Sequence, residues 1–425
     1  MRRLLSFGRN SNSSAGVGEL HRQYDEPISV HELLRKMKRL IAVAIGAMAG
    51  QGVMLILPFA VPIKQFAALA AVLAISQLIG AIGGFSLELS CPRLSVRLSK
   101  AILYSVATIA IASFIVLIGF KNDLSLRYAA GVTLAWLVTL TNILHSYILF
   151  SGQVRSYASL GIGKALVFLL TFALLIKLGS DPVLSWLLAA SLSLAYILAF
   201  SILRNSSDEI IKEEVLSTWK DVFAFSAPSA VIVAIGALPF VLDRAIAQTY
   251  LGPADFARYT VAVTWAAPLL YLGNIFTNSM ISSRRDETLK SIARSSFALV
   301  AMSILYMIFV AIAARYFIKI PFYANGKDFL KIWGVIAGWF VAYSAVSSPV
   351  AAVVQKSFHA YKLKKLAVIM AVNIAICLGA VALLLQIFGR PTFSPMLEIA
   401  LGAMVAAFLG IGPKVVFVFR HVRHG

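Results

Sequence analysis

The sequence predicts an all-α polytopic membrane protein with 12 transmembrane helices in two six-helix bundles. Apolar residues make up 60% of the 425 residues and charged residues only 13%, whereas soluble domains hold roughly 45–50% and about 25%. The mean hydropathy is +0.86, and apolar runs long enough to cross a membrane follow one another along the chain. These runs do not alternate as barrel strands do, and helices satisfy the backbone inside each run.

The chain begins with a polar segment that is expected to lie outside the bilayer. Residues 1–38 are expected to form a cytoplasmic tail, because their first part holds too little apolar surface to fold alone. Ser29 and Glu32 fit a capping box, and the basic amphipathic stretch around them predicts a lead-in helix on the inner leaflet. The twelve spans are expected at residues 40–61, 66–89, 101–120, 129–151, 157–178, 183–203, 222–242, 257–281, 292–317, 329–354, 363–388 and 396–419.

The spans divide into two halves, and the distribution of charge orients them. Residues 39–203 form the first predicted bundle and 222–425 the second, with a charged cytoplasmic linker at 204–221 between them. Most of the 38 Lys and Arg residues, Lys414 among them, are assigned to the tail and to every second loop, on the side expected to be cytoplasmic. The positive-inside rule therefore places both termini in the cytoplasm.

The two halves also resemble one another in short stretches. A Leu-Pro-Phe sequence closes the first span at 57–59 and recurs near the end of the seventh at 238–240. The connection between spans four and five, 152–157, resembles the connection between spans ten and eleven, 355–361. Together these matches suggest a six-plus-six duplication, and such repeats usually place a transport site at their interface.

Composition and motifs exclude several classes of function. The formal net charge of +20 does not indicate nucleic-acid binding, because the basic residues are spread over alternate loops. The outer loops hold no paired carboxylates, no Gly-x-Ser-x-Gly motif and no phosphate-cradling loop, so no enzyme is predicted. Cys91 and Cys377 have no disulfide or metal spacing, and no cofactor or metal is expected. His145, alone in span four, is expected to be a hydrogen-bonded core residue.

Charged residues at membrane depth are the candidate site residues, because ionisable groups are costly there and face interiors or water-filled cavities. Lys164 lies about 10 Å along its helix, at ~1.5 Å per residue, so it is not a loop residue. Lys64 either snorkels to the headgroups or faces a cavity. Asp243 and Arg244 diverge by about 100° on a helix and are not expected to pair; one is expected to face a lumen. The candidates are Lys64, Arg155, Lys164, Asp243 and Arg244.

Proline and tryptophan residues complete the pattern. Each proline removes a backbone donor and can kink its helix, so bends could let the two bundles pivot. The tryptophans are expected mostly in the aromatic belt at the membrane interfaces. The hinge candidates are Pro58, Pro62, Pro228, Pro239 and Pro268, and the belt candidates are Trp136, Trp186, Trp265, Trp333 and Trp339.

One motif connects the chain to a known family. Asp243-Arg244 is followed by Leu251-Gly252 and by Tyr259 at the start of the next span. This order resembles the polysaccharide flippases of the multidrug/oligosaccharidyl-lipid/polysaccharide exporter superfamily, whose fold is MATE-like. Weaker matches run over 84–93, where a Gly-Leu pattern precedes an Arg, and over 152–157, which holds Arg155. The chain departs from the family at 255–258, where Asp-Phe-Ala-Arg stands in place of a stretch with glycine.

The resemblance implies translocation of a polyprenyl-diphosphate-linked oligosaccharide across the bacterial inner membrane, for the biosynthesis of O-antigen, capsule or exopolysaccharide. The implied partners are that substrate, the membrane lipids and a polysaccharide polymerase with its chain-length machinery. Lys64, Arg155, Lys164 and Arg244 would meet phosphate or acidic sugar. Alternating access between the bundles would be the mechanism.

Three other classes of protein remain open. A cation-coupled drug exporter of the same superfamily needs an intramembrane carboxylate, and this chain has few acids at membrane depth. A membrane polymerase or ligase of lipid-linked glycans usually needs a sizeable outer loop, and every outer loop here is short. A purely structural scaffold would not require Lys164.

Overall fold

The computed structural model describes residues 54–84, 86–94, 96–119, 125–150, 154–205, 218–281, 289–357, 360–388 and 394–424. Within these ranges the chain is helical apart from short turns, and no residue forms a strand. The predicted tail, the lead-in helix, most of the first span and most of the linker lie outside the described residues. The all-α fold class is confirmed.

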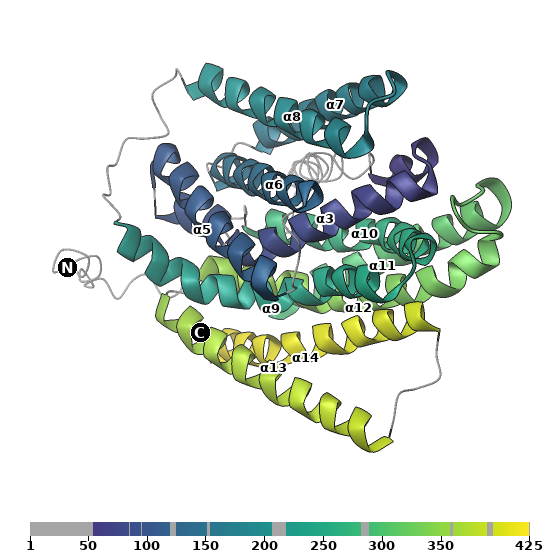
Figure 1. Ribbon diagram of the computed structural model, residues 1–425. Helices are drawn as coiled ribbons and strands as arrows, with labels where there is room; N and C mark the ends of the chain where they lie inside the picture. Colours follow the sequence, from purple (N-terminus) through teal and green to yellow (C-terminus); the bar gives the residue numbers. More distant parts are fainter. Residues whose placement is uncertain are drawn as a thin grey trace, which may run out of the picture.

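The described helices lie side by side as long rods (Figure 1). Ten of them are long and apolar enough to cross a membrane. Residues 54–60 are also helical, and a π-helical turn follows α11 at Ala313–Phe317. The helices are α3 (Ile63–Gly83), α4 (Leu87–Arg93), α5 (Leu98–Gly119), α6 (Leu126–Phe150), α7 (Val154–Lys177), α8 (Pro182–Asn205), α9 (Trp219–Tyr250), α10 (Pro253–Ile281), α11 (Leu289–Ile312), α12 (Gly326–Ser357), α13 (Ala360–Phe388) and α14 (Pro395–His424).

The second predicted span, 66–89, is divided between two helices. Between α3 and α4, Ser86 adopts a φ of 51°, in the left-handed region that is unfavourable for a non-glycine residue. The Ser86 carbonyl accepts hydrogen bonds from both the N–H and the hydroxyl of Ser90, each at 3.0 Å. The hydroxyl of Ser226 in α9 donates to Ser90 Oγ at 2.5 Å. This break is therefore tied to the second half of the chain.

α9 is longer than predicted. It begins with a capping box, in which Thr218 Oγ1 accepts from the Asp221 N–H at 3.4 Å and the Asp221 carboxylate accepts from the Thr218 N–H at 2.9 Å. The helix then runs for 32 residues to Tyr250. Asp243 and Arg244 therefore lie inside the helix and not at its end. The predicted end was wrong because hydropathy falls at this charged pair, although the helix continues.

The hinge candidates are distributed over three helical segments. Pro62 precedes the first residue of α3, with φ −60° and ψ 151°. Two of the prolines are inside α9 and one is inside α10. The positions are Pro58 in the helical segment 54–60, Pro62 before α3, Pro228 and Pro239 in α9, and Pro268 in α10.

Side chains of neighbouring helices hold the backbone near two of these prolines. A proline inside a helix removes the helical donor of the carbonyl four residues earlier and disturbs the turn that precedes it. The Tyr343 hydroxyl of α12 donates to the Gly236 carbonyl at 3.1 Å, three residues before Pro239. The Tyr306 hydroxyl of α11 donates to the Trp265 carbonyl at 2.7 Å, three residues before the proline of α10. The turn before each of these prolines is thus connected to a second helix.

α3 connects the two halves of the chain. It packs on α5 and α6 of the first half and on α9 and α10 of the second (Figure 1). One apolar core continues through this contact and includes Phe66 and Leu69 of α3 with Phe256 and Val261 of α10. Residues from both predicted bundles therefore share a core.

Four of the tryptophans assigned to the interfacial belt are core residues instead. Trp186 and Trp265 are each 8% exposed, and Trp333 and Trp339 are each 3% exposed. All four belong to the same apolar core. The prediction was wrong because the position of a tryptophan near a span end does not tell which face of the helix it occupies.

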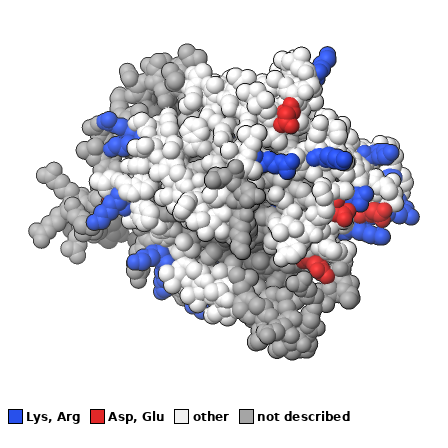
Figure 2. Space-filling view, in the orientation of Figure 1, with Lys and Arg blue, Asp and Glu red and all other residues white. Residues whose placement is uncertain are grey.

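Charged side chains gather toward the two ends of the helices and leave a broad uncharged band between them (Figure 2). On this face, the end where α14 finishes carries Lys and Arg, whereas the opposite end mixes basic with acidic side chains. An uncharged band flanked by charge is the arrangement that a bilayer requires of a membrane-spanning protein.

Candidate functional site

A buried carboxylate connects α9 to α10. Asp243 is 2% exposed and Tyr259 is 1% exposed. The Tyr259 hydroxyl donates to Asp243 Oδ2 at 2.9 Å, and the backbone N–H of Arg244 donates to Asp243 Oδ1 at 2.6 Å. A buried charge is tolerated only when it is paired and hydrogen-bonded. The resemblance placed these three residues in one motif, and they are indeed in contact.

Arg244 folds back along its own helix. Its Nη2 donates to the Phe240 carbonyl at 3.1 Å, and its Nε lies 3.8 Å from Asp243 Oδ1. The expectation that Asp243 and Arg244 do not pair was therefore wrong. Adjacent side chains leave a helix in different directions, but the long arginine side chain can bend back to reach the neighbouring carboxylate. The side chain is 16% exposed, and Nε is buried without a hydrogen-bond acceptor among the described residues.

An aromatic cluster lies beside Arg244. The Phe240 ring stacks on Trp339 with the ring centroids 4.7 Å apart, and it meets Tyr343 edge-on at 4.7 Å. The indole N–H of Trp339 is buried, and no described residue accepts a hydrogen bond from it. The indole N–H groups of Trp265 and Trp333 are also buried and also have no described acceptor. Buried polar groups are usually paired, so several free donors in one region are unusual.

Lys164 lies inside the first half of the chain. It is part-buried in α7, close enough to His145 of α6 to interact with it electrostatically. The hydroxyl of Ser193 in α8 donates to the Lys164 carbonyl at 3.3 Å, which joins α8 to α7 at this level. No described carboxylate lies within ion-pair distance of Lys164. His145 packs against the Tyr157 ring at 5.5 Å, and its buried Nε2 has no described hydrogen-bond partner, contrary to the expectation for this residue.

The remaining candidates are more peripheral or less defined. Lys64 is exposed in the first turn of α3. Arg155 is the second residue of α7, and its side chain lies outside the described part of the structure. Lys164 and Arg244 are on helices with different neighbours, since α7 packs on α8 and α6 whereas α9 packs on α3, α13 and α14. The candidates therefore do not form one contiguous cluster.

Lys414 is an interior cation that sequence reasoning assigned to the cytoplasmic basic residues. The buried face of α14 includes Ala403, Ala407, Ile411 and Val418, which are 8%, 1%, 5% and 0% exposed. Lys414 falls on this face at helical spacing and is itself part-buried. No described carboxylate pairs with it. Its place inside the predicted span 396–419 was the signal that could have identified it.

The departure from the family motif at 255–258 has a structural role. Arg258 Nη1 lies 3.0 Å from Asp255 Oδ1, and its Nε donates to the Phe322 carbonyl at 2.9 Å. Phe322 has a φ of 69°, and its ring lies 5.4 Å from Phe66 of α3. The Tyr323 hydroxyl donates to the Arg258 carbonyl at 2.8 Å, and burial raises the pKa of this phenol, so it remains a donor. Arg258 thus fixes the loop before α12 against the first half.

No cluster of three or more His, Cys, Asp or Glu side chains suited to a metal ion occurs in the described ranges. The arrangement is instead a set of buried or part-buried donors and cations, with one buried carboxylate that is already engaged, Asp243, and a part-buried one, Glu88 of α4. These donors and cations are of the kind that form charge-assisted hydrogen bonds with acceptor-rich, anionic groups.

Comparison with known proteins addresses the fold. No protein-family model and no curated protein sequence matches the chain. Solved structures do match. A MOP superfamily transporter from Pyrococcus furiosus, described as having a binding pocket of reverse polarity that suggests a different function, superposes with a TM-score of 0.56 at 13% identity, over 94% of this chain and 99% of that one.

Two further structures give similar values. The eukaryotic MATE transporter AtDTX14 has a TM-score of 0.57 at 14% identity and covers 92% of this chain and 99% of its own. A mutant of the Vibrio cholerae MATE transporter VcmN has a TM-score of 0.57 at 9% identity, over 92% and 97%. Identities this low establish the architecture alone. The chain therefore has the MATE-like polytopic membrane fold of the MOP superfamily transporters.

Proposed function

We propose that this protein translocates a polyprenyl-diphosphate-linked oligosaccharide across the bacterial inner membrane by alternating access, in the biosynthesis of a surface polysaccharide. The observation that carries the proposal is the excess of free donors and cations in the interior. Arg244 Nε and the indole N–H groups of four tryptophans lack acceptors among the described residues, whereas the amide oxygen of Gln77 is a buried acceptor without a donor. Lys164 and Lys414 add two part-buried cations, one in each half of the chain.

This chemistry complements a glycolipid diphosphate. The diphosphate is anionic and rich in acceptors, and each sugar hydroxyl costs roughly 4–8 kcal/mol to transfer from water to a solvent that cannot hydrogen-bond. Arg and Lys stabilise phosphate oxygens by charge-assisted hydrogen bonds. Indole N–H groups can donate to sugar hydroxyls, and these buried tryptophans would become available to a sugar when the two halves move apart. The apolar prenyl chain needs no such help, because it can stay in the lipid.

The rival function is cation-coupled export of small molecules, which the fold equally accommodates. A cationic drug or a coupling proton needs an available carboxylate. Asp243 is buried, and its oxygens already receive the Tyr259 hydroxyl and the Arg244 N–H. Glu88 of α4 is a second, part-buried carboxylate. The interior cations Lys164, Arg244 and Lys414 outnumber these two acids, which favours an anionic substrate.

The residue roles follow from position. Lys164, Arg244 and Lys414 are proposed to meet the diphosphate or acidic sugars inside the protein, with Asp243 positioning Arg244. Lys64 and Arg155, at the starts of their helices, would attract the headgroup before and after passage. The proline-containing helices α9 and α10 would bend as the two halves move, and the polysaccharide polymerase would receive the product.

The experiment is depletion of the protein in its host followed by mass analysis of lipid-linked sugars in each leaflet. We expect lipid-linked oligosaccharide to accumulate at the inner leaflet and surface polymer to fall. Normal polymer export with lost efflux of a cationic dye would overturn the proposal in favour of the rival.

Complementation with single variants tests the residues. Lys164→Gln, Arg244→Gln and Lys414→Gln should each lower polymer export at least tenfold at a normal protein level. Lys177→Gln, at the exposed end of α7, and Lys365→Gln, on the exposed face of α13, are matched controls that should export normally. Normal export by all three interior variants would remove these residues from the site.

A further inference from the structure

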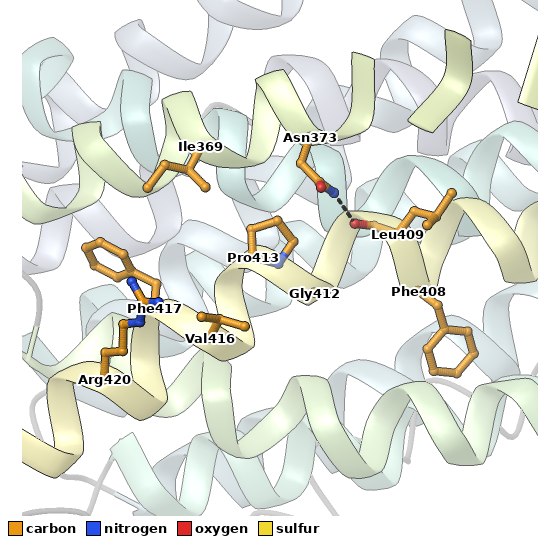
Figure 3. Close-up of a pocket in the computed structure, with 9 residues that line it drawn as sticks. All are labelled: Ile369, Asn373, Phe408, Leu409, Gly412, Pro413, Val416, Phe417 and Arg420. Atoms are coloured by element: carbon orange, nitrogen blue, oxygen red, sulfur yellow. Dashed lines mark hydrogen bonds between the residues drawn. The ribbon is translucent and has the colours of Figure 1, made fainter. Parts of the chain in front are cut away.

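A groove between α13 and α14 lies outside the site described above. It has a volume of about 440 Å³ and is lined on one side by Ile369 and Asn373 of α13 and on the other by residues of α14 (Figure 3). The lining is apolar except for Asn373 and Arg420, and it includes no carboxylate. Neither Lys164 nor Arg244 takes part in it.

A proline of α14, Pro413, lies in the lining of the groove. Pro413 in α14 has no N–H, so the carbonyl of Leu409, four residues earlier, loses its helical donor. The side-chain amide of Asn373 donates to this carbonyl at 2.5 Å (Figure 3). Asn373 is therefore occupied in joining the helices. Next to the proline, a Cβ added to Gly412 would meet no atom within 4 Å, so the groove is open at this point.

The groove opens toward the membrane. α14 is a candidate span from Pro395 to Arg420, so Arg420 lies at the end of the hydrophobic segment. Val416 is 53% exposed, Ile369 is 37% exposed and Phe408 is 36% exposed. In a membrane protein, exposed apolar residues at this depth face lipid chains. Arg420 is also exposed and is positioned where phospholipid headgroups lie.

We propose that this groove is a binding site for one anionic phospholipid, with an acyl chain along the apolar lining and the phosphate at Arg420. Charge complementarity supports this occupant, because the lining holds one cation and no acid. A single arginine matches one phosphodiester, whereas a prenyl diphosphate carries more charge than this groove can balance. Cations near the end of a helix are also favoured by its dipole. The inference does not depend on the proposed function.

The test measures lipid binding by native mass spectrometry of the full-length protein in detergent, with phosphatidylglycerol and phosphatidylcholine offered in equal amounts. One basic residue near the surface contributes ~1 kcal/mol toward an anionic lipid, which corresponds to about a fivefold preference. We expect wild type to prefer phosphatidylglycerol by about fivefold at one site. Arg420→Gln should reduce the preference to less than about twofold.

Two matched pairs separate the groove from general effects. Gly412→Leu fills the groove and should abolish the bound lipid. Gly402→Leu, at an exposed glycine of α14 that also has no atom within 4 Å of an added Cβ, should not. Lys364→Gln, at an exposed position near the start of α13 that is off the face carrying Ile369 and Asn373, should keep the preference that Arg420→Gln loses. An unchanged preference in Arg420→Gln or retained lipid in Gly412→Leu would overturn the assignment. Binding of farnesyl diphosphate in place of phosphatidylglycerol would also overturn it.

Discussion

Replacing Tyr259 with Phe removes one hydroxyl from a buried ionic contact. The hydroxyl lies 2.9 Å from Asp243 Oδ2, and both side chains are at most 2% exposed. Without the hydroxyl, Asp243 Oδ2 loses its tyrosine donor, and the site is too deeply buried for water to replace that donor easily. A hydrogen bond to a charged group contributes about 1.5–3 kcal/mol, whereas side-chain bonds within membranes average ~0.6 kcal/mol and reach ~1.7.

We therefore expect Tyr259→Phe to lower the free energy of unfolding by about 1.5 kcal/mol, near the upper limit for membrane proteins. Tyr343→Phe is the matched control, because its hydroxyl also bonds to α9, at the uncharged Gly236 carbonyl. Its cost should be ~0.6 kcal/mol. The assay is denaturant unfolding in mixed micelles followed by tryptophan fluorescence.

A double-mutant cycle isolates the ionic contribution. In an Asp243→Asn background the Tyr259→Phe change should cost no more than the Tyr343→Phe control, giving a coupling energy of about 1 kcal/mol. Equal costs of Tyr259→Phe in the wild-type and Asp243→Asn backgrounds would refute the reasoning, since the hydroxyl would then not act on the carboxylate.

Two packing predictions follow from the same helices. An added Cβ at Gly273 would lie 2.3 Å from Ser348 Oγ, so Gly273→Val should separate α10 from α12 and cost about 1–3 kcal/mol, while Gly338→Val, with open space around it, should be nearly neutral in the same unfolding assay. Ser296→Ala removes the hydroxyl that donates to the Ala345 carbonyl at 2.7 Å. This carbonyl has no helical donor, because the residue four positions later is Pro349. This loss should cost ~0.6 kcal/mol, and an effect that persists after that proline is replaced with alanine would contradict the explanation.

Hydropathy was sufficient to predict the fold class, because a bilayer requires long apolar helices whatever their packing. The breaks within spans and the ends of helices were harder to predict from hydropathy. The left-handed Ser86 that divides the second span has no signal in its residue type, since its conformation depends on contacts with Ser90 and α9. The extension of α9 past Asp243 was missed because hydropathy measures transfer to lipid and not helix continuity.

The sequence predicted several residues of the candidate site, but not which of them are in contact. The motif located Asp243, Arg244 and Tyr259 on adjacent helices, yet only their three-dimensional packing reveals the bond between hydroxyl and carboxylate. Lys414 was assigned to the cytoplasmic side although it lies within an apolar span, because positive charge near the C-terminus fits the positive-inside pattern. The buried Trp339 was assigned to the interface for a similar reason. One-dimensional patterns cannot tell which face of a helix meets another helix.

The central claim is that interior donors and cations carry an anionic glycolipid headgroup across the membrane. The most direct measurement is the rate at which purified protein in proteoliposomes moves a short-chain, fluorescent polyprenyl-diphosphate oligosaccharide between leaflets. The account predicts transfer well above protein-free vesicles, reduced at least tenfold in Lys164→Gln and Arg244→Gln and unaffected in Lys177→Gln. Equal rates in the interior variants and wild type, or transfer of a cationic dye but not of the glycolipid, would contradict it.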